Sequence, residues 1–221
     1  PPIFQAEDGI RDLVLSLVGS EMCIRDRVGN ARREANPAHT GEESYNYFLT
    51  VIFPHDQMQN LDYNRVVRDL NGLSKDGFLA AVGTAFDLEL SDRPVKPASS
   101  GEFGMYLDGQ WYRLRIHEER IPEEDPVARL DVSLLQNNLI EPVLGIEDPR
   151  RDDRIDFVGG IRGLEGLEKR VDSGDWELAF ALFPTTMKAL MDVADAGEVM
   201  PPKSTWFEPK LADGLISHVL D

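Results

Sequence analysis

The feature that most constrains the fold is a β-hairpin signal between residues 103 and 116. Phe103 to Leu107 and Trp111 to Ile116 are rich in aromatic and branched apolar residues, a composition typical of half-buried strands. Asp108 and Gly109 lie between them. This pair favours a type I′ turn, because both central residues of that turn take a positive φ. The sequence therefore predicts two adjacent antiparallel strands here.

Further strands and helices are expected on both sides of this hairpin. Ser74 is a predicted N-cap whose helix continues to about Phe86, with an inward face of Phe78, Leu79 and Val82. Residues 61–70 fit either a strand or a helix. The other strands are expected at 47–53, 155–158, 176–183 and 215–220, and the other helices at 126–142, 164–171 and from Thr185 or Thr186 to Ala196.

The order of these elements predicts the fold class. Strands and helices mix along the chain, and residues 155–183 form a βαβ-like passage. We expect an α/β or α+β fold, with a mixed sheet that contains the hairpin and is flanked by helices.

Composition excludes several kinds of partner. The 221 residues include 23 Lys plus Arg and 40 Asp plus Glu, for a net charge of -17. Phosphate backbones and anionic membrane surfaces attract basic proteins, so neither nucleic acid nor a membrane is an expected partner. No apolar run approaches the roughly 18 residues of a membrane span. We expect a cytoplasmic protein, and its length suits one domain of ordinary size or one large domain with an appendage.

The first 27 residues differ from the rest of the chain. Residues 4–12 and 16–27 resemble translated sequencing-adapter DNA, which occurs at the ends of reading frames assembled from environmental reads. We therefore divide the chain into a non-native segment, 1–27, and a natural fragment, 28–221. The alternative is a short amphipathic helix, because the apolar residues between Ile10 and Val18 have helical spacing. The single cysteine, Cys23, lies in this segment and gives only weak support for a reducing compartment.

Two short motifs are candidate anion sites. Gly159, Gly160 and Arg162 follow a predicted strand and open a helix, where backbone amides, the helix dipole and a guanidinium favour phosphate. A tight turn that merely needs glycine explains the same pattern and is the favoured reading.

Lys203, Ser204 and Thr205 form the second motif. They bring one ammonium and two hydroxyl groups together after two prolines. No glycine-rich P-loop precedes them, so they indicate either a phosphate or carboxylate site or a plain entry into a strand.

Other catalytic signals are weak. The four histidines, His39, His55, His117 and His218, lack metal-ligand spacing, and no metal site is expected. No nucleophile motif is present. The catalytic residues are therefore not assigned from the sequence.

A set of short runs after residue 28 identifies a relationship. The runs are Arg33 to Pro37, His39 to Glu43, Tyr45 to Phe48, Leu61 to Val67, Phe103 to Gly109, Gly145 to Arg150, Asp156 to Ile161 and Met200 to Lys210. In these runs the chain resembles domain-of-unknown-function family 1015, over essentially all of residues 28–221.

The resemblance implies a function, and this chain also lacks one part of the family's sequence. The family is similar to the ParB/sulfiredoxin superfamily, which includes nucleotide-dependent free-serine kinases. It therefore implies phosphoryl transfer between ATP or ADP and serine or phosphoserine, with Mg²⁺, in either direction. Family members also have an N-terminal half that ends in an Asp-Gly-His-His-Arg motif, which this chain lacks.

That departure leads to the expectation that the fragment alone is inactive, because phosphoryl transfer depends on groups placed around the moving charge. The alternative is a non-catalytic module that binds a small ligand or regulates an enzyme. A ParB-like DNA-binding role conflicts with the negative charge.

Overall fold

The computed structural model describes residues 13–15, 19–47, 52–208 and 218–219. The chain divides into two compact units, Pro1–Gln59 with Pro209–Asp221, and Asn60–Glu208. No helix in the described ranges is both long and apolar enough to cross a membrane.

The smaller unit contains a long helix and a short strand pair. Its elements are β1 (Leu13–Leu15), α1 (Gly19–Ala35), η1 (Ser44–Asn46), β2 (Ile52–Pro54) and η2 (His55–Gln57). β1 pairs with β2 in antiparallel fashion.

Helix α1 runs across the predicted boundary between residues 27 and 28, so the division of the chain there stays a prediction. The alternative of an early helix is wrong at Leu13–Leu15, which is a strand.

A carboxylate organises the loop after α1. Glu43 accepts hydrogen bonds from the backbone amides of Thr40 (2.7 Å) and Gly41 (2.9 Å). These bonds stabilise the ionised form and lower the pKa of Glu43 to about 2, with the amide of Thr40 as the largest cause. Local hydrogen bonds to this carboxylate therefore hold the loop in place.

The larger unit is built on one six-stranded sheet. Its strand order is β5-β7-β6-β9-β4-β8, and every neighbouring pair is antiparallel. The strands are β4 (Tyr63–Val67), β5 (Phe86–Ser91), β6 (Glu102–Leu107), β7 (Gln110–Ile116), β8 (Ile155–Gly159) and β9 (Leu178–Leu182). A separate small pair joins β3 (Gln59–Leu61) to β10 (Trp206–Glu208).

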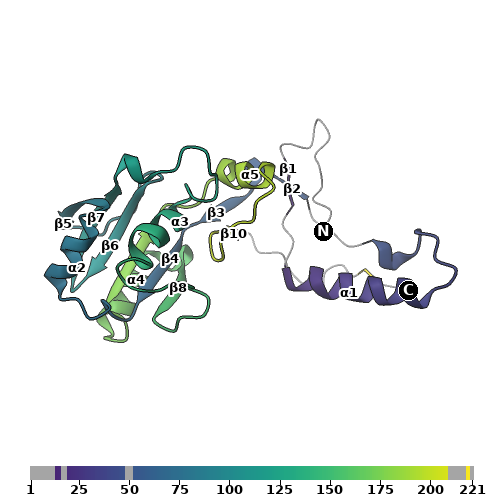
Figure 1. Ribbon diagram of the computed structural model, residues 1–221, viewed down its shortest axis with the longest axis horizontal. Coiled ribbons are helices and arrows are strands. Elements are labelled where there is room, and N and C mark those ends of the chain that lie inside the picture. The colour runs from purple at the N-terminus through teal and green to yellow at the C-terminus, as the bar shows by residue number, and fades with distance from the viewer. Residues whose placement is uncertain (1–12, 16–18, 48–51, 209–217, 220–221) are drawn as a thin grey trace. The chain divides into compact units, whose positions relative to one another are not determined.

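Helices lie on both faces of this sheet. They are α2 (Lys75–Val82), η3 (Glu118–Arg120), α3 (Asp131–Leu135), the π-helical turn η4 (Gln136–Ile140), η5 (Gly160–Arg162), α4 (Gly163–Asp172) and α5 (Met187–Asp195). Residues of α2, α3, η4 and α5 share one apolar cluster, and residues of α4 belong to another. Figure 1 shows α5 and β10 towards one end of the sheet and α2 towards the opposite end.

Alternation along β9 explains why the two clusters separate. Leu178, Phe180 and Leu182 belong to the cluster of α2, α3 and α5, while Ala179 and Ala181 belong to the cluster of α4. Successive side chains of a strand point to opposite faces, so this strand gives large residues to one side and small ones to the other. The small face leaves room for α4 close to the sheet.

The predicted hairpin and two predicted caps are confirmed. β6 and β7 pair around Asp108 and Gly109, whose φ values are 50° and 73°. The hydroxyl of Ser74 accepts from the amide of Gly77 at the start of α2, and that of Thr186 accepts from Ala189 at the start of α5. The fold class is also confirmed as a mixture of helices with a sheet.

Several predicted boundaries are wrong. The helix expected from Pro126 begins at Asp131, because the carboxylate of Asp125 accepts from the amides of Val127 and Ala128 and forms a turn first. The helix from Ser74 ends at Val82, and Phe86 begins β5. The ambiguous stretch 61–70 contains strand β4. Most of the strand expected at 215–220 lies outside the described residues, as do residues 48–51 of the strand expected at 47–53.

The βαβ-like passage is present in a split form. β8 and β9 both pair antiparallel to β4, so they are parallel to each other and β4 lies between them. The crossover through α4 therefore joins two strands that do not touch. We expected a mixed sheet, but every hydrogen-bonded pair in it is antiparallel, because the two parallel strands are not neighbours.

Two glycine substitutions test how tightly this sheet is packed. A Cβ at Gly104 would collide with the carbonyl oxygen of Val95 and would lie 3.1 Å from the ring of Trp111. We expect Gly104→Ala to lower the free energy of unfolding by about 1–3 kcal/mol, the usual cost of overpacking. Gly83→Ala is the matched control, because its Cβ meets only ordinary contacts, at 3.5 Å and 3.6 Å. Urea unfolding of both variants checks this, and equal effects would contradict it.

Candidate functional site

Topology places two helix N-termini at the same end of the sheet. β8 and β9 are parallel, and each is followed by a helix, α4 after the turn η5 and α5 after a short loop. We call residues 159–163 and 183–187 the β8–β9 end. Helix N-termini carry unpaired amides and a positive dipole end, and ligands of crossover folds often bind beyond the carboxyl ends of strands.

A buried amide holds this end of the sheet together. Asn64 is fully buried, and its side-chain oxygen accepts from the amide of Leu182 at 2.9 Å. Its side-chain nitrogen donates to the carboxylate of Asp62 at 2.5 Å. The side chain thus satisfies a backbone amide where the ladder between β4 and β9 ends.

Close packing explains the two glycines of the first predicted motif. A Cβ at Gly159 would overlap the indole ring of Trp206, and one at Gly160 would overlap the carboxylate of Asp62. The amide of Gly160 already donates to the carbonyl oxygen of Asp62, at 2.8 Å. This geometry supports the turn interpretation, and the nearby carboxylate disfavours an anion at Gly160. Arg162 is exposed in η5.

Only part of the second predicted motif is accessible to a ligand. Ser204 is only 5 % exposed, and its hydroxyl donates to the carbonyl oxygen of Pro201 at 2.6 Å. Its own carbonyl accepts from the hydroxyl of Thr185 at 2.9 Å. Lys203 is exposed, and its ammonium nitrogen lies 5.7 Å from the centre of the Tyr63 ring. Thr205 is half-buried. Lys203 is therefore the group of this motif that a ligand can reach.

The backbone of Lys203 is strained. Its φ of 59° lies in the left-handed region, which costs a residue other than glycine on the order of 1 kcal/mol. The guanidinium of Arg65 donates to the carbonyl oxygen of Lys203 at 3.1 Å and helps to hold this conformation. Strain of this kind is common where a side chain has to be presented in one direction.

Arg65 is a functional candidate that the sequence analysis missed. It is 4 % exposed, burial lowers its pKa to about 10, and its guanidinium lies 5.1 Å from the centre of the Phe157 ring. It donates to the carbonyl oxygens of Tyr63 and Lys203, and no ion pair to it is found in the part of the chain that the structure describes. The signal in the sequence is a charge inside the strand-forming run Tyr63 to Val67.

A small cavity lies beside Gly160. It has a volume of about 40 Å³ and is lined by residues that include Asp62, Lys96 and Gly163. A space of this size holds a water molecule but not a nucleotide.

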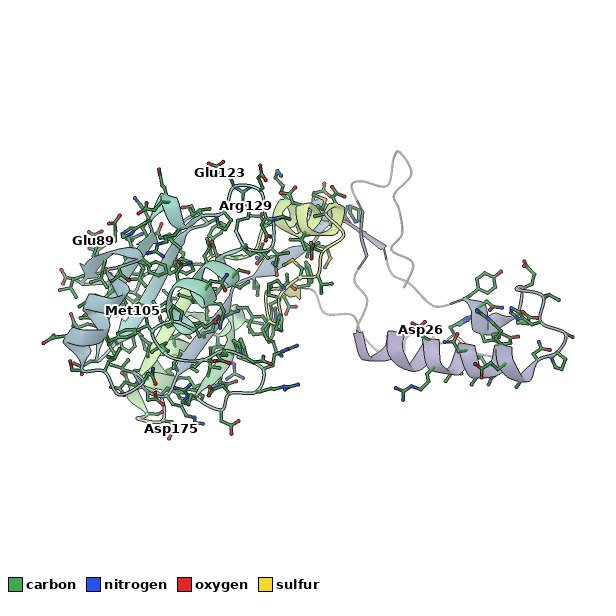
Figure 2. The ribbon with its side chains drawn as sticks, in the orientation of Figure 1. Asp26, Glu89, Met105, Glu123, Arg129 and Asp175 are labelled. Carbon is green, nitrogen blue, oxygen red and sulfur yellow. The ribbon has the colours of Figure 1, made fainter. Side chains whose placement is uncertain are left out.

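A larger cavity lies at the start of α5. Its volume is about 230 Å³, and we call it the α5 cavity. Figure 2 labels Arg129, which lies on the loop beside α5. The lining residues are Ser100, Pro126, Arg129, Leu130, Asp131, Phe183, Pro184, Thr185, Thr186, Lys188, Ala189 and Asp192.

Asp131 is the titratable group buried in the α5 cavity. It is 8 % exposed, and one carboxylate oxygen, Oδ1, accepts from the hydroxyl of Ser100 (2.7 Å) and the amide of Gly101 (2.8 Å). Burial raises the pKa of Asp131 to about 6, against the opposing effect of these two hydrogen bonds. Such shifts are frequent at functional sites. The sequence signal was an acid within the apolar stretch 127–135, and it was missed.

The predicted site residues therefore fall into two groups. Gly159 pairs with Tyr63 and contacts Trp206, near Lys203. Gly160 is one position further on and faces Asp62, on the other face of the sheet. Of the six predicted residues, only Gly160 lines either of the two cavities described above. A single phosphate site formed by all six stays a prediction.

The raised pKa of Asp131 predicts a pH-dependent stability. Because the folded state binds this proton more tightly than the unfolded state, the contribution of Asp131 falls as pH rises from about 4 through 6. Asp131→Asn keeps an acceptor for Ser100 and Gly101 but has no charge to bury. We expect the free energy of unfolding of this variant, relative to that of the natural chain, to increase by about 2–3 kcal/mol from pH 4 to pH 7.5. Urea unfolding at both pH values measures this, with Asp192→Asn as control; parallel changes in all three proteins would contradict it.

One family model matches part of the chain. Residues 25–133 match the family DUF1015, described as a protein of unknown function. The match begins close to the predicted boundary at residue 28. Beyond residue 133 the resemblance stays a prediction. No curated protein matches the chain.

Solved structures give only distant likenesses. A conserved hypothetical protein from Pyrococcus furiosus is 14 % identical with a TM-score of 0.41, over 68 % of this chain and 56 % of that one. A free serine kinase in complex with AMP is 13 % identical with a TM-score of 0.41, over 88 % of this chain and 86 % of that one. A mutant of a free serine kinase in complex with ADP has a TM-score of 0.40 at 12 % identity, with the same coverage. The family match is the firm result: across residues 25–133 this chain carries the DUF1015 sequence pattern.

Proposed function

We propose that this chain is the C-terminal part of a cytoplasmic enzyme that transfers a phosphoryl group between a nucleotide and serine or phosphoserine. Either direction of transfer fits the residues. In this proposal the chain supplies the surface that holds the small substrate, and the groups around the nucleotide phosphates come from outside it. The proposal rests on the resemblance described above and on the chemistry of the β8–β9 end.

The observation that carries the proposal is a cavity with a buried carboxyl group at the start of α5, at the end of the sheet where α4 also begins on the opposite face. α4 and α5 both start there because β8 and β9 are parallel. The α5 cavity lies at the start of α5 and is lined by the buried carboxyl group of Asp131. Phosphoryl transfer relies on positioned dipoles and charges, so this arrangement suits its substrate side.

Two cations would favour a phosphate on the face of Tyr63. The ammonium of Lys203 is exposed there, and the buried guanidinium of Arg65 lies beneath the same segment. A buried charge without a carboxylate partner acts through a lower dielectric than water and is felt at longer range. Lys203 would contact the phosphate directly, and Arg65 would hold Lys203 in place and add to the positive potential.

Metal ions enter the proposal only through the resemblance. Among the residues that the structure describes, no group of three or more His, Cys, Asp or Glu side chains is placed to hold a metal ion. We therefore assign Mg²⁺ no ligand in this chain and derive no step through it. The same holds for ATP and ADP, for which we assign no contact.

A second function, binding of a small ligand without catalysis, is favoured by two contacts. The carboxylate of Asp62 occupies the space beside Gly160, and the hydroxyl of Ser204 is used within its own turn. Both contacts reduce the number of groups that are free to act on a phosphate. A regulatory module would need only the α5 cavity.

An activity assay separates the two functions. We expect the 221-residue chain to show no turnover with phosphoserine and ADP, or with serine and ATP, in the presence of Mg²⁺. The longer parent protein is expected to turn over one of these pairs. Turnover by the chain itself would contradict the assignment of the missing groups, and an inactive parent would favour the module.

Loss of the Lys203 charge gives a binding test that needs no turnover. We expect Lys203→Gln to weaken binding of O-phospho-L-serine by about three- to tenfold, because one exposed charge-assisted contact is lost. Isothermal titration calorimetry at low salt measures the dissociation constant. Lys169→Gln removes the same charge from an exposed position on α4, where Lys169 lies 3.8 Å from Glu165, and should leave the affinity within about twofold. Equal losses in the two variants would show only a general charge effect.

A further inference from the structure

One carboxylate oxygen in the α5 cavity has no partner. Both hydrogen bonds to Asp131 go to Oδ1, from Ser100 and Gly101. Within the described ranges of the chain, no donor is found for the other oxygen, Oδ2, and no ion pair joins Asp131 to another residue. The side chain is nevertheless more than nine-tenths buried and lines the cavity. An unpaired buried carboxylate is costly, so a protein that retains one usually has a use for it.

The basic residues that line the α5 cavity do not neutralise this carboxylate. The ammonium of Lys188 is held by Asp192, at 2.6 Å and 2.8 Å. Arg129 is exposed and forms no ion pair with Asp131 in the part of the chain that the structure describes. Asp192 adds a further negative charge to the lining. The buried position therefore calls for a cation or a strong hydrogen-bond donor from outside the chain.

The start of α5 favours a negatively charged group, whereas Asp131 calls for a cation or a donor. The hydroxyl and carbonyl of Thr186 accept from Ala189 and Leu190. The two amides before these, of Met187 and Lys188, donate no hydrogen bond within the described residues, as expected for the first turn of a helix. The dipole of this nine-residue helix favours negative charge at the same point. A cation-seeking carboxylate and an anion-seeking helix end thus face one cavity.

The volume limits the ligand to a small molecule. The α5 cavity measures about 230 Å³, below the roughly 300–1,000 Å³ of sites for drug-sized ligands. Its lining combines hydroxyl groups with the apolar side chains of Leu130, Phe183 and Ala189. A free amino acid has a suitable size and carries both charges.

We propose that the α5 cavity binds a small free amino acid, with the ammonium group against Oδ2 of Asp131 and the carboxylate toward the first turn of α5. An ammonium has three donors and supplies both the missing hydrogen bond and the missing charge. This inference deepens the proposed function, because it names the substrate group that the cavity recognises. It rests on that function for the choice of serine as the first ligand to test.

The main experiment compares ligands with and without an ammonium group. The full 221-residue chain is titrated at pH 7 with L-serine and with N-acetyl-L-serine, without nucleotide, and binding is followed by calorimetry. L-serine is expected to bind, and N-acetyl-L-serine at least about tenfold more weakly, because acetylation removes the charge and two donors. Equal affinities, or no binding of L-serine at all, would overturn the proposal.

Two variants locate the contact. Asp131→Asn keeps an acceptor for Ser100 and Gly101, and we expect it to weaken L-serine binding at least about tenfold. Asp195→Asn removes an equal charge from an exposed position at the end of α5, outside the cavity lining, and should change the affinity by no more than about threefold. Circular dichroism and urea unfolding verify that both variants are folded. Normal binding by the folded Asp131→Asn variant would overturn the proposal.

The pH dependence gives a readout that a purely structural role would not produce. An ammonium binds the ionised carboxylate, and the pKa of Asp131 is about 6. The affinity for L-serine should therefore rise roughly tenfold from pH 5 to pH 7 in the natural chain and stay nearly flat in Asp131→Asn. Arg129, Lys188 and Asp192 are the other charged groups of the cavity, and Asp195→Asn, which leaves all three in place, should keep the rise. A flat profile in the natural chain would count against the Asp131 contact.

These measurements can fail independently of the proposed function. They use equilibrium binding and contain no nucleotide, so an inactive parent protein would leave a positive result intact. Conversely, an active parent whose chain shows no Asp131-dependent binding would keep the phosphotransferase proposal and overturn only this assignment.

Discussion

The position of β4 between β8 and β9 is the constraint on which the candidate site depends. Because β4 is antiparallel to both neighbours, the two outer strands run in the same direction and end at the same side of the sheet. Each then continues towards a helix, so α4 and α5 both begin at this end, on opposite faces of the sheet. Asn64 makes this arrangement stable where the ladder stops, by accepting from Leu182 inside a buried environment. The site is therefore a consequence of strand order.

Burial shifts the pKa values of two charged side chains at this end of the sheet. Arg65 and Asp131 are both more than nine-tenths buried, and their pKa values shift in the directions that burial dictates, downward for the base and upward for the acid. Each is held by hydrogen bonds to uncharged groups rather than by an opposite charge. Such groups cost stability in the empty protein, and a bound ligand of opposite charge would remove part of that cost.

Local signals in the sequence were reliable where a single short motif sets the geometry. Asp108 and Gly109 determine the turn of the hairpin through their positive φ values, and Ser74 and Thr186 cap their helices. The same kind of reasoning failed at Pro126, because the carboxylate of Asp125 makes a competing turn that delays the helix to Asp131. The glycines at 159 and 160 are required by the ring of Trp206 and the carboxylate of Asp62, which come from residues far away in the chain.

The sequence by itself determined the strand-and-helix composition, the hairpin, the helix caps and the match to the DUF1015 model over residues 25–133. It could not determine which groups share a cavity, because residues such as Ser100, Asp131 and Thr186 line the same space although tens of positions separate them in the sequence. Only the tertiary structure decided that Gly159 and Gly160 face different sides of the sheet and that Ser204 is occupied in a turn. The physical reason is that burial and charge pairing are properties of the packed chain, whereas turn and cap preferences are properties of a few neighbouring residues.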